Sequence, residues 1–319
     1  MKKILWLTVF CILLFGKNIV GIYRNDGIQN VERYLEKKLK SQTFWLNYIK
    51  NRNTDFGYYE NLEYLIVAVK SEKKIYIYKN SKEGLKLLKT QFVIVGKAGD
   101  KLREGDLKTP VGVYRLLRKF KPDDQFYGPF AYALSYPNTF DKLKGKSGHG
   151  IWIHGSPLDG TPRNSQSKGC IVLDNKKLKD LDKLINPKKT LLIIAEKSLN
   201  KVTKGEISTI LVSLFKWRYA WKKSDIENYL DFYSDDFKRF DGKRKKAFAR
   251  MKRIIFSRKE KKEILFKNIN IAPYPSIENK NIFRITFYEK YKARKYKFNG
   301  KKELYVELKD NQFKILSEK

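Results

Sequence analysis

Both histidines of the chain, His149 and His154, lie a short distance before Cys170. An imidazole can remove the proton of a nearby thiol, and the resulting thiolate attacks carbonyl carbon. These residue types predict acyl transfer through a cysteine, with Cys170 and His154 as the reacting pair. A buried thiol beside an unrelated turn histidine is the structural alternative, and spacing alone leaves it open.

Small residues surround the thiol in the sequence. Ser167 and Gly169 let the backbone approach a substrate closely, so amide groups near Cys170 can donate to a developing oxyanion. The imidazole also needs an acceptor for its other ring nitrogen, and no carboxylate is obvious for this role. The backbone carbonyl of Gly155 is the local candidate.

Two motifs carry a family resemblance. The first is His154-Gly155 followed by Ser167-Lys168-Gly169-Cys170, and the second is Val95-Gly96-Lys97 with the later stretch from Lys108 to Tyr114. Over about residues 60 to 197 the chain resembles the L,D-transpeptidase catalytic domain, the YkuD family. The resemblance implies these roles: Cys170 as nucleophile, His154 as general base and acid, Gly155 as backbone orienter, and Ser167 with Gly169 as residues that shape the oxyanion site.

Three further residues near these motifs are candidates for substrate binding, namely Lys168, His149 and Arg163. A loop arginine can hold a substrate carboxylate with two hydrogen bonds, while a solvated arginine is the plainer interpretation. His149 either lines the substrate groove or is satisfied by a turn. Val172 and Lys168 depart from the pattern of cross-linking members of the family, which disfavours transpeptidation.

The start of the chain has the pattern of a secretory signal. Lys2 and Lys3 precede the apolar run from Ile4 to Phe15, and we assign residues 1–20 to a signal peptide. The run is shorter than the roughly 20 residues that span a bilayer, so no stable membrane span is expected. This predicts export to the periplasm. Removal of the signal leaves Cys170 as the one cysteine, which excludes an internal disulfide.

The chain is strongly basic, with 69 Lys and Arg against 34 Asp and Glu and a formal charge of +35. Such a charge attracts polyanions, but the cations are spread over the whole chain, as on a generally lysine-rich surface. Export argues against nucleic acid as a partner. No metal or other cofactor is expected, because one cysteine and two histidines lack the repeated spacing of zinc ligands.

Three segments follow the signal. Residues 21–58 have apolar positions among charges and predict one or two amphipathic helices, which we expect to form a scaffold or dimerisation element. Residues 59–198 contain short β-rich runs and predict a mostly-β YkuD-like catalytic domain. In residues 203–319 helices come first and strands afterwards, which predicts an α+β domain that resembles the NTF2-like superfamily.

The individual elements follow from periodicity. Expected strands of the catalytic domain cover 65–69, 74–78, 91–95 and 190–195, with a helix at 178–185. Expected helices of the C-terminal domain cover 207–221, 226–233 and 248–256, and its expected strands cover 264–271, 282–291, 296–298, 304–308 and 313–316.

The whole arrangement resembles the cell-shape L,D-carboxypeptidases of helical Gram-negative bacteria. That resemblance implies a hydrolase of peptidoglycan stem peptides, which removes the terminal D-alanine from tetrapeptide muropeptides through a Cys170 thioester and leaves tripeptides. An L,D-transpeptidase that forms 3-3 cross-links or attaches proteins to the wall is the alternative, and a non-catalytic wall-binding protein is the second.

Two partner predictions accompany this reading. We expect a homodimer through the N-terminal helices. We also expect the C-terminal domain to position the enzyme on glycan strands or a partner, with the help of basic residues such as Lys292, Arg294 and Lys295.

Overall fold

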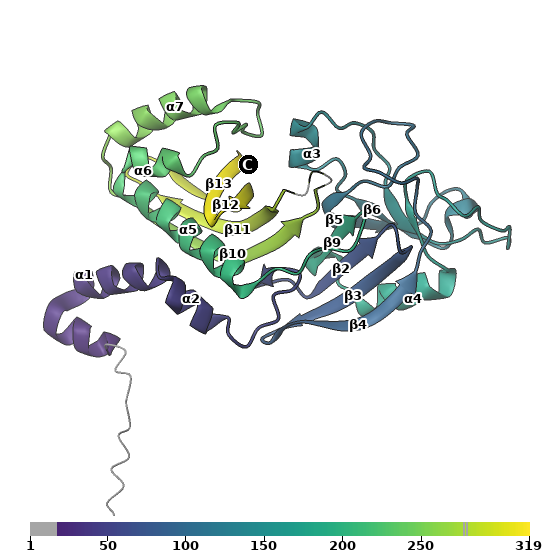
Figure 1. The fold of residues 1–319 in the computed structure, drawn as a ribbon, viewed down its shortest axis with the longest axis horizontal. Helices are drawn as coiled ribbons and strands as arrows, with labels where there is room; N and C mark the ends of the chain where they lie inside the picture. Colours follow the sequence, from purple (N-terminus) through teal and green to yellow (C-terminus); the bar gives the residue numbers. More distant parts are fainter. Residues whose placement is uncertain (1–17, 277, 279) are drawn as a thin grey trace, which may run out of the picture.

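The computed structural model describes residues 18–276, 278 and 280–319, in two bodies that lie side by side along the long axis (Figure 1). One body contains an eight-stranded sheet in the order β4-β3-β2-β9-β5-β6-β7-β8, and the other a five-stranded sheet in the order β1-β10-β11-β12-β13. The predicted signal peptide falls mostly outside the described residues. No described helix is long and apolar enough to cross a membrane.

The first body is the catalytic domain. Its strands are β2 (Tyr64–Val69), β3 (Lys74–Ser81), β4 (Gly84–Phe92), β5 (Gly112–Phe120), β6 (Ala131–Leu134), β7 (Trp152–His154), β8 (Ile171–Val172) and β9 (Thr190–Ala195). Its helices are α3 (Thr139–Leu143) and α4 (Asn175–Leu184), with 3₁₀ turns at Gln125–Tyr127 and Pro187–Lys189.

The neighbouring inner strands β2 and β9 separate two apolar cores, one on each face of the sheet. β2 and β9 pair in parallel, with Leu65 opposite Leu191 and Ile66 opposite Leu192. Ile66 and Leu192 join one apolar cluster with α4, whereas Leu65 and Leu191 join another that includes residues of the C-terminal domain. Strands with both faces buried are continuous apolar runs, as β2 and β9 are.

The second body combines the C-terminal domain with the start of the chain. Its helices are α5 (Lys204–Lys223), α6 (Ile226–Asp231) and α7 (Lys245–Ser257), and its strands are β1 (Tyr58–Tyr59), β10 (Glu263–Tyr274), β11 (Ile282–Lys292), β12 (Lys297–Lys309) and β13 (Gln312–Glu318). A capping box of Thr203 and Glu206 starts α5. The apolar face of α5 packs against the sheet around the fully buried Trp217.

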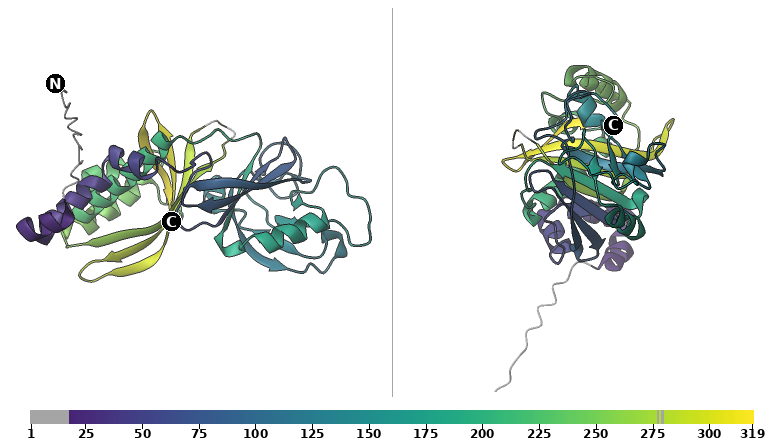
Figure 2. Two further views of the ribbon diagram at one scale, coloured as in Figure 1. Left: turned by 90° about the horizontal axis from the view of Figure 1, so that it is seen from below. Right: turned by 90° about the vertical axis from the view of Figure 1, so that its right-hand side faces the viewer.

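The N-terminal helices α1 (Ile19–Leu39) and α2 (Gln42–Tyr48) lie along α5, at the same end of the molecule (Figure 2). The Trp45 ring stacks on Phe215 with a centroid distance of 5.4 Å. Arg218 of α5 binds Glu36 of α1 at 2.6 Å. These helices therefore contribute to the core and the ion pairs of the C-terminal domain.

Helix α3 joins the two bodies. The Phe140 ring stacks on Tyr305 of β12 with a centroid distance of 4.6 Å. The fully buried Asp141 accepts hydrogen bonds from the hydroxyls of Tyr114, in the catalytic domain, and Tyr274, in the C-terminal domain. The two domains therefore share this buried contact and one apolar cluster, so each domain buries part of its surface against the other.

The predicted fold class is confirmed, with a sheet-rich YkuD-like domain and an NTF2-like domain. Two strand predictions are wrong. The predicted strand at 91–95 is mostly loop, because β4 ends at Phe92 and Ile94 makes only an isolated bridge to Val172. The strands predicted at 296–298 and 304–308 are one continuous strand, β12, since its polar middle also pairs with β11.

Candidate active site

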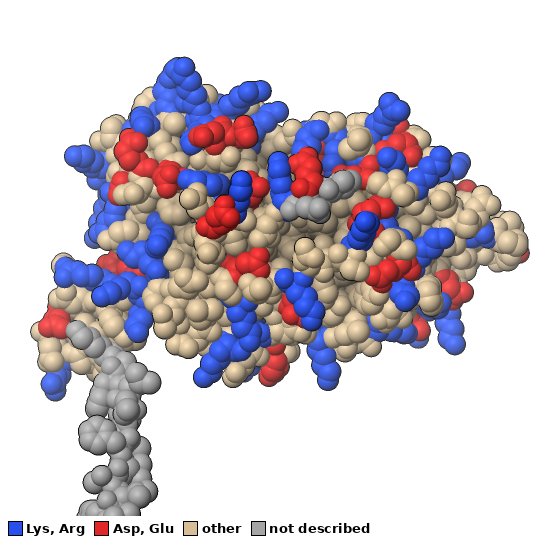
Figure 3. All heavy atoms as spheres, viewed as in Figure 1, with Lys and Arg blue, Asp and Glu red and all other residues tan. Residues whose placement is uncertain are grey.

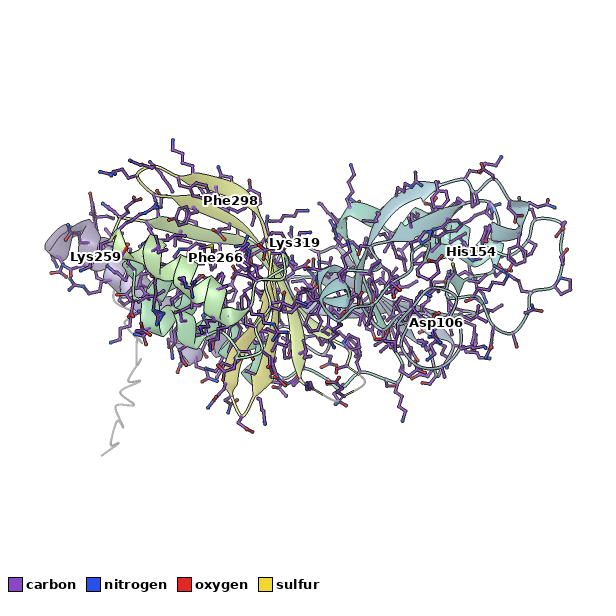
Figure 4. All side chains as sticks on the ribbon, turned by 90° about the horizontal axis from the view of Figure 1, so that it is seen from above. Asp106, His154, Lys259, Phe266, Phe298 and Lys319 are labelled. Carbon is purple, nitrogen blue, oxygen red and sulfur yellow. The ribbon has the colours of Figure 1, made fainter. Side chains whose placement is uncertain are left out.

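The strand pair β7 and β8 positions the candidate catalytic residues. The strands are parallel, with Ile153 opposite Ile171 and His154 opposite Val172. Ile153 and Ile171 point into the core cluster, so alternation places His154 and Val172 on the other face. Cys170 directly precedes β8 and shares this parity. The thiol and the imidazole thus lie on one face of this strand pair. Figure 4 shows His154 within the catalytic domain, well away from the C-terminal domain.

His154 is held as a neutral base. The side chain is 1% exposed, and burial lowers its pKa to about 4, with the Arg163 charge acting in the same direction. Nδ1 lies 2.7 Å from the carbonyl oxygen of Gly155. Because a carbonyl only accepts, Nδ1 carries the proton, and the lone pair is on Nε2. The backbone-orienter geometry predicted for Gly155 is therefore present.

Only glycine fits at position 155. A Cβ atom there would lie 2.1 Å from Oδ1 of Asn175 and 3.0 Å from Cδ of Pro129. The same Asn175 oxygen accepts the backbone N–H of Ser156 at 2.9 Å. The Gly155 N–H donates to the carbonyl of Tyr127 at 3.1 Å, so both backbone groups of this glycine are fixed.

Cys170 is half-buried and rests as a thiol. Its Sγ lies 3.6 Å from the carbonyl oxygen of Gly150, which accepts the S–H. Burial raises the pKa of the thiol, and the Trp152 backbone and the charges of Arg163 and Lys101 oppose that rise. At neutral pH the pair is thus a neutral thiol and a neutral imidazole, so proton transfer must accompany attack.

Ser167 fixes the backbone around the thiol. Its N–H donates to Val95 at 2.9 Å, and its hydroxyl donates to the carbonyl of Cys170 at 2.6 Å. The same hydroxyl accepts the N–H of Gly169 at 3.1 Å. Gly169 has φ of +124°, and a Cβ there would meet the Lys108 carbonyl at 2.9 Å. The motifs around Val95 and Lys108 therefore support the loop that carries Cys170.

Arg163 lies against the imidazole. Its Nη2 is 3.3 Å from Nδ1 and 3.2 Å from Nε2 of His154. A nitrogen this close to both ring nitrogens lies over the ring and not along the lone pair of Nε2. The guanidinium also lies over the Phe126 ring, 4.0 Å from its centroid, and its Nε is buried without a hydrogen-bond partner. A partly buried cation with an unused donor thus adjoins the pair.

The two remaining candidates face solvent. His149 is 81% exposed and lies 3.8 Å from Glu104, which is also exposed. Lys168 is exposed as well. No described contact links either side chain to Cys170 or His154. Within residues 18–276, 278 and 280–319, no group of three or more His, Cys, Asp and Glu side chains is arranged to hold a metal ion.

Comparison with known proteins places this geometry in a family. The family model of the L,D-transpeptidase catalytic domain (YkuD) matches residues 63–194, and that of the Cds6 C-terminal NTF2-like domain matches residues 209–319. The crystal structure of the helical cell shape determining protein Pgp2 from Campylobacter jejuni is similar at 44% identity with a TM-score of 0.83. The similarity covers 88% of this chain and 100% of that one.

The chain belongs to the L,D-transpeptidase (YkuD) family, with a C-terminal NTF2-like domain. Bd1075 from Bdellovibrio bacteriovorus is similar at 26% identity with a TM-score of 0.66, over 84% of this chain and 97% of that one. The putative L,D-transpeptidase YafK of Escherichia coli is 29% identical over 119 residues, which cover 36% of this chain and 44% of YafK. The match thus spans less than half the length of that curated relative.

Sequence reasoning missed three residues of this YkuD site. Phe126 and Tyr127 belong to a short 3₁₀ turn, and the Tyr127 ring packs edge-on against His154 at 5.1 Å. Asn175 starts α4 and braces the turn after His154. No motif signals these contacts, although the aromatic pair before Gly128 could have suggested a packed turn.

Proposed function

We propose that this protein is a periplasmic peptidoglycan L,D-carboxypeptidase that removes the terminal D-alanine from stem tetrapeptides. The observation that carries the proposal is the pairing of Cys170 with a buried, neutral and oriented His154 on adjacent strands. The likeness to a cell shape determining protein along nearly the whole of that chain supports a role in cell shape.

The residues support a two-step reaction. As Sγ of Cys170 attacks the carbonyl carbon of the third stem residue, its proton passes to Nε2 of His154. Collapse of the tetrahedral intermediate breaks the C–N bond, and the imidazolium gives that proton to the departing amine of D-alanine. Water, deprotonated by the same nitrogen, then cleaves the thioester and releases the tripeptide and the thiol.

Arg163 fits the free carboxylate of the substrate. The leaving D-alanine carries this carboxylate, and the guanidinium has a buried donor without a partner beside the catalytic histidine. An arginine matches a carboxylate with two parallel hydrogen bonds. Recognition of this end selects stems that terminate at the fourth residue, which are the substrates of trimming. His149 and Lys168, both exposed, have no role in this proposal.

Product analysis tests the proposal against its alternatives. Disaccharide tetrapeptide incubated with the purified protein is expected to give disaccharide tripeptide and free D-alanine. Dimers with 3-3 cross-links as the main product would instead support the transpeptidase activity that the printed name of YafK suggests. No change of the muropeptide, together with binding to it, would support a non-catalytic wall-binding protein.

We also propose the homodimer expected from the sequence. Several apolar residues of α1 remain exposed although the helix packs on α5: Ile19, Val20, Tyr23, Ile28 and Leu35. Light scattering during size-exclusion chromatography is expected to give twice the mass of the chain. A monomer at all concentrations up to about 100 μM, a range in which specific interfaces associate, would contradict the proposal.

A further inference from the structure

A group of unpaired cations surrounds a depression at one end of the C-terminal domain. The depression has a volume of about 1310 Å³ and is lined by the loop after α7 and the tip of the β11–β12 hairpin. We call its seven cations the basic end: Arg258, Lys261, Lys262, Lys292, Arg294, Lys295 and Lys297. Two carboxylates, Glu260 and Glu263, also line it.

The charges of the basic end are only partly balanced within the protein, because two carboxylates accompany seven cations. Among the described residues, none of its seven cations forms an ion pair with a carboxylate, whereas nearby Lys222 pairs with both Glu32 and Glu36. Lysine and arginine side chains are scattered over the whole visible face (Figure 3), so net charge alone does not distinguish this end. The excess of seven cations over two carboxylates around one depression does, and it favours an anionic ligand with several charges.

Apolar side chains at the basic end favour a lipid surface over a soluble polyanion. Tyr296 is 61% exposed between Lys295 and Lys297 at the hairpin tip. Its ring packs against the Tyr291 ring, with a centroid distance of 5.8 Å. Ile254 is 60% exposed one helical turn before Arg258. Tyrosine beside lysine and arginine is typical of protein segments at the level of lipid headgroups.

The position of the basic end fits this interpretation. Lys259 of the same loop and His154 lie at opposite ends of the molecule (Figure 4). Lys261 also lines a second depression, with Arg33 and Lys37 of α1. The second half of α1 therefore lies beside the basic end.

We propose that the basic end docks the protein on the surface of a membrane rich in anionic phospholipids. The phosphates of the headgroups supply the missing counter-charges, and Tyr296 enters the headgroup layer. Docking in this orientation directs the active site away from the bilayer. The inference does not depend on the chemistry proposed for Cys170.

Vesicle sedimentation tests the docking surface. Residues 4–15 could bind lipid themselves, so the experiment uses the chain from Asn18 onward, which keeps the cap of α1 and all three apolar clusters. Its folding is verified by cooperative thermal unfolding. Vesicles contain either phosphatidylcholine alone or a 7:3 mixture with phosphatidylglycerol, roughly the anionic content needed for surface attraction.

We expect binding to the mixed vesicles and none to phosphatidylcholine alone. The triple variant Arg294→Gln, Lys295→Gln, Lys297→Gln is expected to bind about 100-fold more weakly, or roughly five-fold per charge. The matched control Lys176→Gln, Lys179→Gln, Lys183→Gln removes the same charge from exposed positions of α4 in the catalytic domain. It is expected to lose less than about three-fold, because these lysines are far from the docking surface.

Three results would overturn the proposal. The first is an absence of binding to mixed vesicles at about 0.05 M salt, where surface attraction is strong. The second is an equal loss in both triple variants, which would indicate nonspecific attraction by net charge. The third is sedimentation with wall sacculi that the hairpin variant abolishes while vesicle binding is unchanged. Cleavage of soluble muropeptide is expected to be the same in all three proteins.

Discussion

The active site and the interior of the C-terminal domain both bury ionisable groups, but these groups are neutral in the active site and partly ionised in the C-terminal domain. Among the described residues neither His154 nor Cys170 forms an ion pair, and burial keeps both neutral: it lowers the pKa of the imidazole and raises that of the thiol in spite of the nearby Arg163 charge. In the C-terminal domain, Glu318 stays ionised, because Lys302 and Lys252 outweigh its burial and hold its pKa below the usual range.

Buried ionisable groups of the C-terminal domain differ in how far burial disfavours their charged forms. Lys252 of α7 lies over the rings of Trp221, Tyr229 and Phe248, at 4.9 to 5.3 Å from their centroids, and burial lowers its pKa to about 8. Burial raises the pKa of Glu289, whose Oε2 has no hydrogen-bond partner. The comparison shows that the available partner, and not burial alone, decides whether a buried group carries charge.

Removal of the nucleophile is the strongest test of the active-site half of this comparison. Cys170→Ala is expected to lower kcat at least about 10³-fold, because the thioester cannot form. The melting temperature should remain within about 2 °C of the wild type, since the thiol makes a single weak contact with Gly150. Retention of muropeptide cleavage by this variant would show that Cys170 is not the nucleophile.

The paired and unpaired carboxylates of the C-terminal domain provide the next test. Glu318→Gln is expected to lower the free energy of unfolding by about 3 kcal/mol, because it leaves Lys302 and Lys252 without their main counter-charge. Glu289→Gln is the matched control and should change stability by less than about 1 kcal/mol, because one of its oxygens has no partner to lose. Urea denaturation measures both, and equal losses would contradict the distinction.

The pH dependence of stability tests the neutral state of His154. Its folded pKa of about 4 lies below the ordinary value of 6.5, so folding favours the deprotonated form. The contribution is complete above about pH 6.5 and is lost as pH falls towards 4, which amounts to at most about 3 kcal/mol. In a His154→Gln variant, the fall in stability over this window should shrink by that amount. An unchanged pH profile would show that the imidazole is not desolvated.

The candidate catalytic pair could be recognised in the sequence because a thiol and an imidazole have distinctive chemistry. Cys170, His154 and the two glycines define local backbone and side-chain geometry over a short stretch. Strong apolar periodicity likewise predicted β2, β9 and α5. The position of Arg163 could not be predicted, since it depends on Phe126, which is distant in sequence and reaches the loop only through the fold.

The same limit applies to contacts at the start of the chain that the sequence did not predict. Residues 21–58 were expected to form amphipathic helices of a scaffold or dimerisation element, and the structure adds that Trp45 and Tyr58 enter the core of the C-terminal domain and that β1 pairs with β10. A two-residue strand has no periodic signal, and its partner lies at the other end of the sequence. Such long-range pairing is a property of the fold that local patterns do not contain.

The last prediction tests whether the substrate carboxylate pairs with Arg163, as Glu318 pairs with Lys302 in the C-terminal domain. Arg163→Gln is expected to raise KM for disaccharide tetrapeptide about 10- to 100-fold with a smaller effect on kcat, because the guanidinium donates two hydrogen bonds to the D-alanine carboxylate. Lys176→Gln, an exposed change of equal charge, should leave both constants within about two-fold. Arg163→Lys keeps the charge but not the paired donors, so its KM should lie between those of the other two variants.

A substrate with an amidated terminal carboxyl tests whether Arg163 recognises the carboxylate or only supports His154. The wild type should lose as much on this substrate as the Arg163→Gln variant loses on the natural one, and the variant should not distinguish the two substrates. Equal discrimination by both proteins would show that Arg163 only packs against His154.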